Sequence, residues 1–356
     1  MFSLKHIYAV EITLKRETAP DGTVTETETV KVTYSQDWPA YNAAATSEKR
    51  HFIELLAGLC EEVEQPVQTF GRPRFPLADM VFAAAYKVYS GFSSRRFTTD
   101  LQEASRAGVI FRAPHFNSVS NYLSDPTLTP ILKALIERAA TPLRSLESDF
   151  AIDSSGFSTS RFDRWFDKKY GKVRFEHHWV KIHLICGVRT NVVTSVEVTP
   201  TETADAPQLS ALLASTAQRF TVSQVSGDKA YSSRRNLHAI DALGATPYIP
   251  FKKGTKGAGT RHGFDGLWSR AWAFYTYNQD AFMAQYHKRS NVETTFSMIK
   301  AKFGDAVRSK SDIGQVNEVL CKVLCHNICC LIQSMYEFGV DPTFCAQIQA
   351  AQEVGA

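Results

Sequence analysis

Two short runs near the amino terminus alternate apolar and polar side chains with a period of two. The apolar positions are Tyr8, Val10, Ile12 and Leu14 in the first run and Val30, Val32 and Tyr34 in the second. Pro20, Asp21 and Gly22, which favour turns, lie between the two runs. A period of two is the spacing of a strand with one buried face, so this pattern predicts a β-hairpin within residues 1–46.

Between residues 47 and 148 the apolar positions recur with helical spacing. The series begins at Phe52, Leu55, Leu56 and Leu59 and continues at 77–89, 97–107, 118–123 and 128–139, with prolines and Gly91 between the runs. The pattern predicts a helical domain that serves DNA binding or dimerisation. A helix-turn-helix fits best at 93–123, where Arg95, Arg96 and Arg106 would contact phosphates. A helical packing scaffold is an equally good interpretation.

From Asp149 onwards short β-rich runs alternate with helical ones. Strands are expected at 150–154, 179–188, 192–198, 222–228 and 246–249, and helices at 207–220, at 232–243 and from about Ala281. This order predicts an α/β domain over residues 149–336, with a mixed sheet flanked by helices. Residues 251–281 are read as a short basic insertion in that domain, and residues 337–356 as a C-terminal tail.

Composition and charge narrow the class of protein. The chain has 356 residues, of which 44% are hydrophobic and 21% charged, and this excludes a disordered chain. The net charge of +4 is small, but it is unevenly distributed. Residues 161–189 hold eight Lys and Arg against three Asp and Glu, and residues 251–310 hold eleven against four. Such local excess is typical of a surface that binds nucleic acid.

Cysteine content and hydropathy indicate a protein of a reducing compartment that does not span a membrane. Seven cysteines, an odd number, and an amino terminus without the apolar core of a signal peptide predict a cytoplasmic protein with free thiols. The most apolar stretch, 319–335, is interrupted by Lys322, His326 and Asn327. It is therefore expected to be a buried helix. Cys321, Cys325 and Cys329 share one face of it, and without a second spaced pair they do not predict a zinc site.

Two aspartates stand where strands are expected to end. Asp153 follows the apolar run Phe150–Ile152, and Asp228 follows Gly227 at the end of the run that contains Val222 and Val225. Asp after a strand is common turn chemistry, which is the simpler interpretation of each one alone. A carboxylate at the end of a buried run also needs a partner, such as a metal ion or a basic side chain.

The predicted helix around Tyr286 carries a polar stripe. At about 100° per residue, Tyr286, Arg289, Glu293 and Lys300 fall within roughly 60° of one another. The apolar residues Val292, Phe296, Ile299 and Phe303 form the adjacent face. An exposed i,i+4 ion pair would explain Arg289 and Glu293. It would not explain the tyrosine or the distant lysine.

The spacing Tyr286-x2-Arg289-x3-Glu293-x6-Lys300 resembles the YREK signature of bacterial insertion-sequence transposases of the DDE class. The segments 227–231 and 152–154 resemble those around the second and first catalytic aspartates of that family, and the likeness spans about 149–333. The resemblance implies a ribonuclease H-like fold. One departure is the short interval between Ile249 and Ala281, which argues against functions that need a large insertion domain.

The resemblance also implies a reaction and a set of roles. Transposases cut a phosphodiester and join the freed 3′-hydroxyl to other DNA, with two Mg²⁺ ions, or Mn²⁺ in vitro, held by Asp153, Asp228 and Glu293. Arg289 and Lys300 would hold phosphates, and Tyr286 would contact the DNA backbone. The expected partners are double-stranded DNA, as element ends and target, and further copies of the chain. A nuclease that does not join strands, and a DNA-binding protein that has lost catalysis, are the alternatives.

Other candidates in the sequence are weaker. Trp165, Trp179, Trp268 and Trp272 lie among basic residues and suit base stacking, but core packing is the simpler expectation for each. His177 and His178 precede a strand and are read as structural residues. Ser154 and Ser155 lack the glycine pattern of a nucleophile elbow, so they are not expected to act as nucleophiles.

Overall fold

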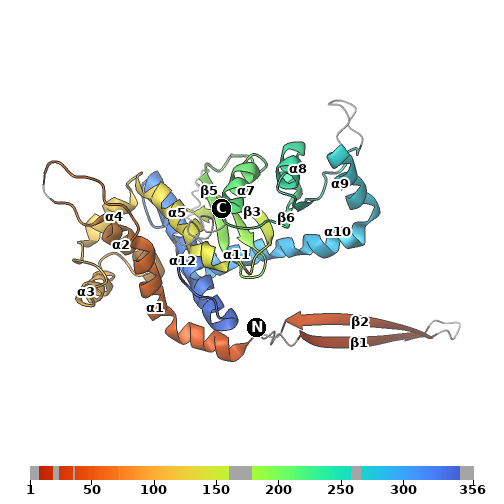
Figure 1. The fold of residues 1–356 in the computed structure, drawn as a ribbon, viewed down its shortest axis with the longest axis horizontal. Helices are drawn as coiled ribbons and strands as arrows, with labels where there is room; N and C mark the ends of the chain where they lie inside the picture. Colours follow the sequence, from red (N-terminus) through yellow and green to blue (C-terminus); the bar gives the residue numbers. More distant parts are fainter. Residues whose placement is uncertain are drawn as a thin grey trace, which may run out of the picture.

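A five-stranded mixed sheet lies at the centre of the molecule (Figure 1). The computed structural model describes residues 8–18, 24–34, 37–71, 73–159, 179–257 and 266–344. The strands of the sheet are β3 (Asp149–Ser158), β4 (Trp179–Gly187), β5 (Val193–Thr199), β6 (Gln224–Gly227) and β7 (Thr246–Tyr248). Their order is β5-β4-β3-β6-β7. Strand β4 is antiparallel to its neighbours β3 and β5, whereas β6 is parallel to β3 and β7 is parallel to β6. This arrangement confirms the predicted α/β fold class, a mixed sheet flanked by helices.

The register of the sheet decides which side chains share a face. In the antiparallel pair of β3 and β4, Asp153 is opposite Leu184 and Ser154 is opposite His183. Paired residues project to the same side of a sheet and successive residues to opposite sides. Asp153 therefore shares a face with Leu184, whereas Ser154 and His183 share the other face. The turn from β4 to β5 contains Asn191 in the left-handed conformation, with φ of 60°.

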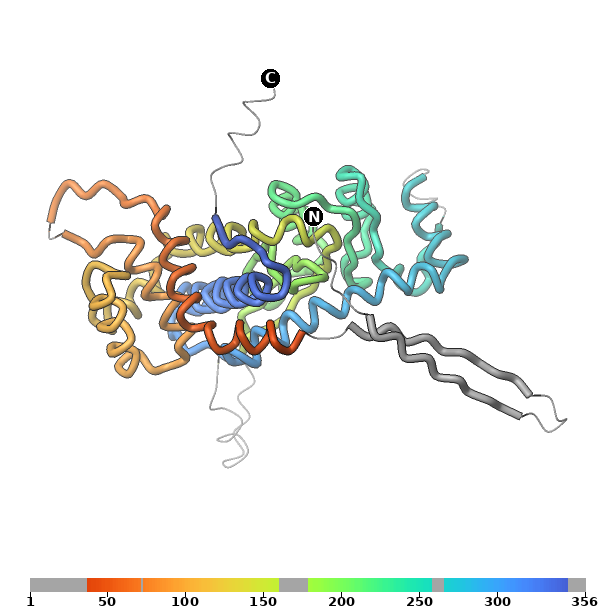
Figure 2. The backbone as a smooth tube through the Cα atoms, turned by 60° about the horizontal axis from the view of Figure 1, so that its bottom comes forward, coloured from red at the N-terminus to blue at the C-terminus, as the bar shows by residue number. Residues whose placement is uncertain are grey.

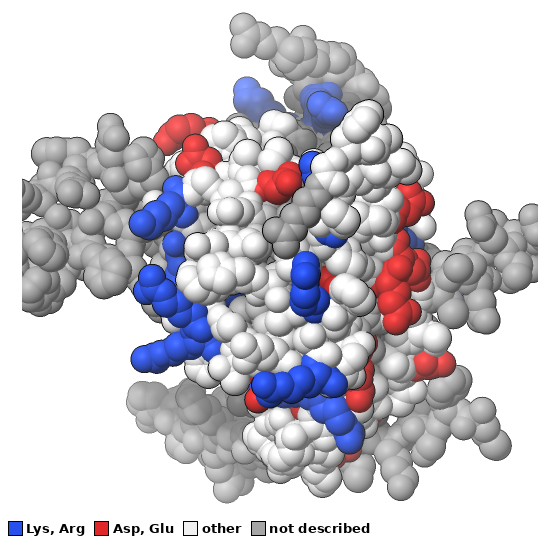
Figure 3. All heavy atoms as spheres, turned by 90° about the vertical axis from the view of Figure 1, so that its left-hand side faces the viewer, with Lys and Arg blue, Asp and Glu red and all other residues white. Residues whose placement is uncertain are grey.

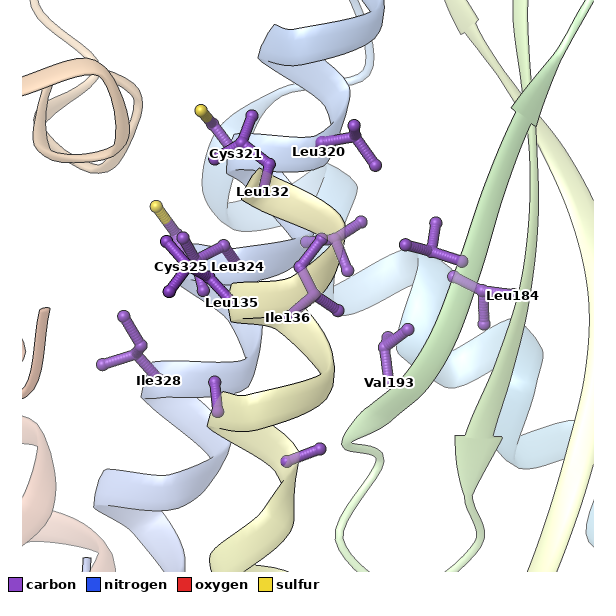
Figure 4. Packing of buried hydrophobic residues seen from close by; sticks show 14 of the residues in the cluster. Leu132, Leu135, Ile136, Leu184, Val193, Leu320, Cys321, Leu324, Cys325 and Ile328 are labelled. Carbon is purple, nitrogen blue, oxygen red and sulfur yellow. The ribbon is translucent and has the colours of Figure 1, made fainter. Parts of the chain in front are cut away.

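Helix α12 (Asp312–Phe338) is the central element of the core. With α5 (Leu128–Ala140) it covers the sheet face that carries Leu184 and Val193 (Figure 4). Cys321 and Cys325 lie in this packing beside Leu132 and Leu135, and both thiols are free. The 27-residue helix is long and apolar enough to cross a membrane, but 78% of its most apolar window is buried inside the protein. It is the buried helix expected from the sequence.

The amino-terminal helices form one end of the molecule (Figure 2). They are α1 (Trp38–Cys60), α2 (Leu77–Ser90), α3 (Thr98–Arg106) and α4 (Phe116–Leu123), and α5 leads through the 3₁₀ turn η1 (Thr141–Leu143) into β3. Helices α1, α2 and α5 pack against α12, so the helical region and the sheet share one hydrophobic core. The predicted hairpin is present, since β1 (Tyr8–Thr18) and β2 (Val24–Tyr34) pair in antiparallel register.

The helices that follow β5 in the chain, up to α9, lie toward the opposite end of the molecule (Figure 1). Helix α7 (Gln208–Ala217) packs on β4 and β5, and α8 (Arg234–Asp241) packs on α7 and β7. A short 3₁₀ turn, η2 (Lys229–Tyr231), lies between β6 and α8. After β7 the chain forms α9 (Gly266–Tyr277), in which no residue is fully buried.

Two expectations about element bounds are wrong. The first strand of the sheet runs to Ser158 rather than ending at Ser154, because residues up to Ser158 pair with β4. The polar stripe does not lie on one continuous helix: α10 (Gln279–Tyr286) gives way to the 3₁₀ turn η3 (His287–Arg289), and α11 (Ser290–Phe303) follows. In η3 the consecutive residues Lys288 and Arg289 both reach carboxylates of β3.

Candidate active site

The two aspartates lie side by side because of the parallel register of β3 and β6. Ile152 of β3 pairs with Gly227, the last residue of β6, and the next residues along the chain are Asp153 and Asp228. Neighbouring strands are about 4.8 Å apart, so the two carboxylates begin from adjacent backbone positions. Gly227 allows this approach, because a Cβ atom there would lie 2.8 Å from Cγ2 of Ile152.

Arg289 connects the first aspartate with the glutamate. Its Nη1 lies 2.9 Å from Oδ2 of Asp153, and its Nη2 forms an ion pair with Glu293. The Asp153 side chain is 22% exposed and that of Glu293 is 58% exposed, so the pair with Asp153 is the more sheltered one. One guanidinium thus joins carboxylates from two elements that are far apart in the sequence.

The charge state of Asp153 reflects this crowding. Burial raises the pKa of Asp153, and the negative charges of Asp228 and Glu293 raise it further. The backbone N–H of Ser154, which donates to Oδ1 over 2.8 Å, and the guanidinium of Arg289 lower the pKa but do not cancel the increase. Asp153 is therefore a carboxylate whose charged form needs a cation beside it.

Tyr286 and Lys300 flank this group. The guanidinium of Arg289 lies 5.9 Å from the centre of the Tyr286 ring, at the end of α10. Lys300 of α11 donates to the hydroxyl of Ser155 over 2.7 Å, and burial lowers the pKa of this lysine. Ser155 is two residues beyond Asp153 on the same strand and therefore on the same face. The structure thus directs Lys300, like Arg289, toward the face of β3 that carries Asp153.

The apolar face of α11 explains why these side chains point toward β3. Val292, Phe296 and Ile299 are buried in the core, and Phe303 packs against it from the end of the helix. Burying that face turns the adjacent side of the helix toward the sheet. The break at η3 alters the start of the stripe, but Arg289, Glu293 and Lys300 still reach the neighbourhood of β3.

Two contacts next to the proposed site were not predicted from the sequence. Lys288 forms an ion pair with Asp149 over 2.8 Å, and Ser155 receives the hydrogen bond from Lys300. For Ser155 the available signal was its spacing of two from Asp153 on one strand. No local pattern distinguished Lys288, because its partner lies 139 residues away.

A buried polar cluster lies on the opposite face of β3 from Asp153. His183, which is fully buried, has Nε2 2.9 Å from the hydroxyl oxygen of Thr199 and Nδ1 3.4 Å from Oδ1 of Asp205. Lys181 pairs with the same carboxylate over 2.9 Å. Burial lowers the pKa of His183, so the imidazole is held neutral. The cluster fixes the loop after β5 against β4, the strand next to β3.

The acidic residues have the ligand atoms that a divalent metal ion prefers, but their side chains do not converge on one point. Asp153, Asp228 and Glu293 offer hard carboxylate oxygens, which are the ligands that Mg²⁺ prefers. Within the described ranges, no group of three or more His, Cys, Asp or Glu side chains is close enough to hold a metal. Arg289 forms ion pairs with both Asp153 and Glu293, so its guanidinium occupies the space between these two carboxylates.

Two of the weaker candidates, Trp268 and Trp272, have structural roles. The indole N–H groups of Trp268 and Trp272 donate to the backbone carbonyls of Lys256 and Thr255, so both rings hold the basic loop that precedes α9. Trp179 is 40% exposed at the start of β4. Trp165, His177 and His178, together with residues 160–178 of the first basic segment, lie outside the described residues.

Comparison with known proteins identifies the family. The family model described as "Transposase DDE domain" matches residues 144–328, more than half of the chain. The chain belongs to the DDE transposase family. The matched range of this transposase contains β3, β6 and α11, the elements that carry Asp153, Asp228 and Glu293. Members of the family act on DNA with divalent metal ions.

Comparisons with solved structures and with curated proteins show weak similarity or none. The solved structure of a piggyBac transposase synaptic complex with hairpin DNA is similar to this transposase at 11% identity, with a TM-score of 0.41. The similarity covers 86% of this chain and 79% of that one. None of the curated proteins compared with the chain matches it.

Proposed function

We propose that this transposase belongs to a bacterial insertion sequence of the YREK type and moves its own element by cutting and rejoining DNA. The spacing of Tyr286, Arg289, Glu293 and Lys300 supports the subgroup. The observation that carries the proposal is the parallel register that sets Asp153 beside Asp228, together with the ion pairs that join Asp153 to Glu293 through Arg289.

Asp153, Asp228 and Glu293 are the proposed metal ligands, and two Mg²⁺ ions, or Mn²⁺ in vitro, are the proposed cofactor. Such ions activate the attacking oxygen and stabilise the leaving one in an in-line displacement. The chain's own residues orient the DNA. Arg289 holds a phosphate by its planar fork, Lys300 supplies a point charge beside β3, and Tyr286 packs against the backbone near the cut.

Two basic surfaces are proposed to carry the DNA beyond the site. Lys252, Lys253 and Lys256 are exposed on the loop that follows β7. At the other end of the molecule, Lys and Arg side chains gather along one side and the lower part of the face shown in Figure 3, and most acidic groups lie on the opposite side. Exposed basic residues of the α3–α4 region are Arg95, Arg96, Arg106 and Arg112.

The proposed working unit is a homo-oligomer that acts on DNA in the bacterial cytoplasm. An element has two ends, and each chain contributes one proposed site, so at least two copies would be needed to treat both ends together. We propose the division into a hairpin region (1–46), a helical DNA-binding or dimerisation domain (47–148), the catalytic domain (149–336) with its short insertion (251–281), and a tail (337–356).

A strand-transfer assay tests the function directly. The substrate is a labelled duplex that carries the DNA flanking the gene, incubated with Mg²⁺, with Mn²⁺ or with EDTA. The wild type is compared with Glu293→Gln and with Glu202→Gln, an exposed residue of the loop after β5. We expect joined products only when metal and Glu293 are both present, and unchanged products with Glu202→Gln.

The other outcomes separate the alternatives. Metal-dependent cleavage without joined products would identify a nuclease. DNA binding without any cleavage, by protein with a native circular dichroism spectrum, would identify a DNA-binding protein. Asp153→Asn and Asp228→Asn are expected to behave like Glu293→Gln, with cleavage lost and DNA binding kept. A folded variant of any of the three that cleaves at the wild-type rate would exclude that residue from the site.

A further inference from the structure

The guanidinium of Arg289 takes the place that a cation bound by the acidic residues would need. It forms one ion pair with Asp153 over 2.9 Å and a second with Glu293. These are two of the three proposed metal ligands, and they come from β3 and α11. Asp228 adds its negative charge to the same group, as its effect on the pKa of Asp153 shows. Arg289 is therefore the counter-ion of these carboxylates in the structure.

A bound metal ion and this arginine exclude one another. Both are cations that need the same carboxylate oxygens, and like charges a few ångströms apart repel strongly in a partly buried site. Asp153 is the sheltered member of the group, with 22% of its side chain exposed, so the repulsion there would be only weakly screened by water. Metal can occupy the site fully only after the guanidinium has moved.

A DNA phosphate is the natural alternative partner for Arg289. The guanidinium fork binds carboxylate and phosphate oxygens with the same planar geometry. Its partner Glu293 is 58% exposed, and η3 lies at the junction of two helices, so the side chain can turn outward without disturbing the core. Lys300, bonded to Ser155 on the same strand face, would place a second charge near that phosphate.

We propose that Arg289 closes the metal site in the DNA-free protein and opens it by transferring its ion pairs to a DNA phosphate. Metal binding is thereby coupled to DNA binding, and the coupling is reciprocal, so bound metal also strengthens the hold on DNA. The inference rests on the proposed function, since it assumes the three acidic residues as metal ligands. Its consequence is that the chain avoids loading the catalytic ions before DNA is present.

The first test measures metal binding without DNA. Mn²⁺ is titrated into the full-length protein while free Mn²⁺ is followed by electron paramagnetic resonance, for the wild type, Arg289→Gln and Lys288→Gln. Lys288 is the matched control, because it is the preceding residue and pairs with Asp149, which lies outside the proposed site. Arg289→Gln is expected to bind Mn²⁺ about fivefold more tightly than the wild type, as removal of a partly exposed ion-paired charge allows. Lys288→Gln is expected to match the wild type.

The second test repeats the titration with a saturating short DNA duplex of mixed sequence, after subtraction of the Mn²⁺ bound by the duplex alone. The difference between the wild type and Arg289→Gln should then disappear, because Arg289 already holds a phosphate. Equal Mn²⁺ affinities in the absence of DNA, or weaker binding by Arg289→Gln, would overturn the proposal. So would a fivefold difference that persists with DNA.

Two further variants separate this inference from the proposed function. Asp153→Asn and Glu293→Gln should lose the tight Mn²⁺ site in the DNA-free protein. If they bind Mn²⁺ as the wild type does, the proposed ligand set is wrong and the inference fails with it. If they lose the site while Arg289→Gln remains identical to the wild type, the ligand set stands and only the role of Arg289 as the closing residue is refuted. Native circular dichroism spectra are the requirement for each comparison.

Discussion

Lys300 and Lys302 show how two charges on one helix can have different roles. Lys302 forms an ion pair with Glu48 of α1, whereas Lys300 donates to the neutral hydroxyl of Ser155. The charge of Lys302 is thus already balanced and ties α11 to α1. The charge of Lys300 lies near the face of β3 that carries Asp153, but Lys300 forms no ion pair with Asp153 or Glu293. Of the two lysines, Lys300 is therefore the better placed to bind a phosphate.

Replacing these two lysines tests the distinction. Lys300→Met is expected to weaken DNA binding and to lower the slope of log affinity against log salt by about 0.9, the value for one lost phosphate contact. Lys302→Met should leave that slope unchanged and lower stability only slightly, because exposed ion pairs contribute about 0–1 kcal/mol. Fluorescence anisotropy with a labelled duplex over a salt series measures both slopes. Equal slopes for the wild type and Lys300→Met would place Lys300 away from the DNA.

His326 predicts a dependence of stability on pH. Burial lowers its pKa to about 4, although the hydrogen bond from Nε2 to the carbonyl oxygen of Asn191, 2.9 Å long, opposes the shift. The imidazole therefore stays neutral in the folded protein, while the unfolded chain takes up a proton below pH ~6.5. Because the unfolded state binds more protons in that window, stability falls as pH decreases from about 6.5 toward 4.

Urea unfolding of the wild type and His326→Gln at pH 7 and pH 5 checks this effect. The wild type should lose about 2 kcal/mol of unfolding free energy between these values through His326, a rough figure from the linkage relation. Between the same pH values, the loss of unfolding free energy in His326→Gln should be smaller than that of the wild type by about 2 kcal/mol. This difference does not depend on the stability of the variant at pH 7. The same loss in both proteins would show that His326 is not the titrating group.

At the scale of elements, the hydrophobic pattern was sufficient to predict β4, β5 and α12, but not the end of β3 or the junction before α11. Apolar residues recur at the positions of an element that face the core, so the hydrophobic pattern identifies elements such as β4 and α12 that pack in the core. The 3₁₀ turn η3 is stabilised by ion pairs of Lys288 and Arg289 with β3, which lies more than 130 residues away in the chain. A local pattern contains no information about such partners.

The same limit applies to the candidate site. The resemblance to the YREK signature, which the spacing of the polar stripe carries, was enough to nominate Asp153, Asp228, Glu293 and their basic neighbours. The pairing of Ile152 with Gly227, which sets the two aspartates side by side, depends on sheet register. Register follows from packing of the whole sheet, so the sequence suggested the members of the site without their arrangement.

Gly227 provides a test of that register. In Gly227→Ala the new Cβ would lie 2.8 Å from Cγ2 of Ile152, so β6 must shift away from β3 and carry Asp228 with it. We expect a loss of about 1–3 kcal/mol in unfolding free energy, together with weaker Mn²⁺ binding. Gly58→Ala is the control, because a Cβ atom at Gly58 in α1 would meet no neighbouring atom. This substitution should raise the free energy of unfolding by about 0.5–1 kcal/mol. Wild-type stability of Gly227→Ala would show that the contact of β3 and β6 is looser than the structure indicates.

At the scale of the whole molecule, a shared core joins the helical region to the catalytic sheet. Asn327 of α12 donates to the carbonyl oxygens of Ile136 in α5 and Val193 in β5, and it accepts from the N–H of Val193. One buried side chain thus connects three elements in the interior. Arg308 donates to the carbonyl oxygen of Gly91, which ties the segment after α11 to the end of α2. DNA held by the helical end would therefore be held at a fixed distance from Asp153.

The salt dependence of DNA affinity tests whether the helical end of the molecule contacts DNA. Arg95 and Arg96 are exposed before α3, and the guanidinium of Arg95 lies 5.7 Å from the ring of Phe116 in α4. If this end contacts DNA, the double variant Arg95→Gln/Arg96→Gln should lower the salt slope by up to about 1.8, since each lost phosphate contact removes about 0.9. Affinity should fall for every duplex sequence, because phosphate contacts carry no sequence information.

The control for this experiment is Lys133→Gln in α5. Lys133 already pairs with Glu197 of β5 over 2.7 Å, so its loss should leave the slope unchanged. Cleavage of a short duplex that reaches only the catalytic face should survive the Arg95→Gln/Arg96→Gln change, because the proposed metal ligands lie on the sheet and α11. An unchanged salt slope in the double variant would instead identify the helical end as a packing or dimerisation scaffold, and sedimentation of the same variant would then show whether its copies still associate.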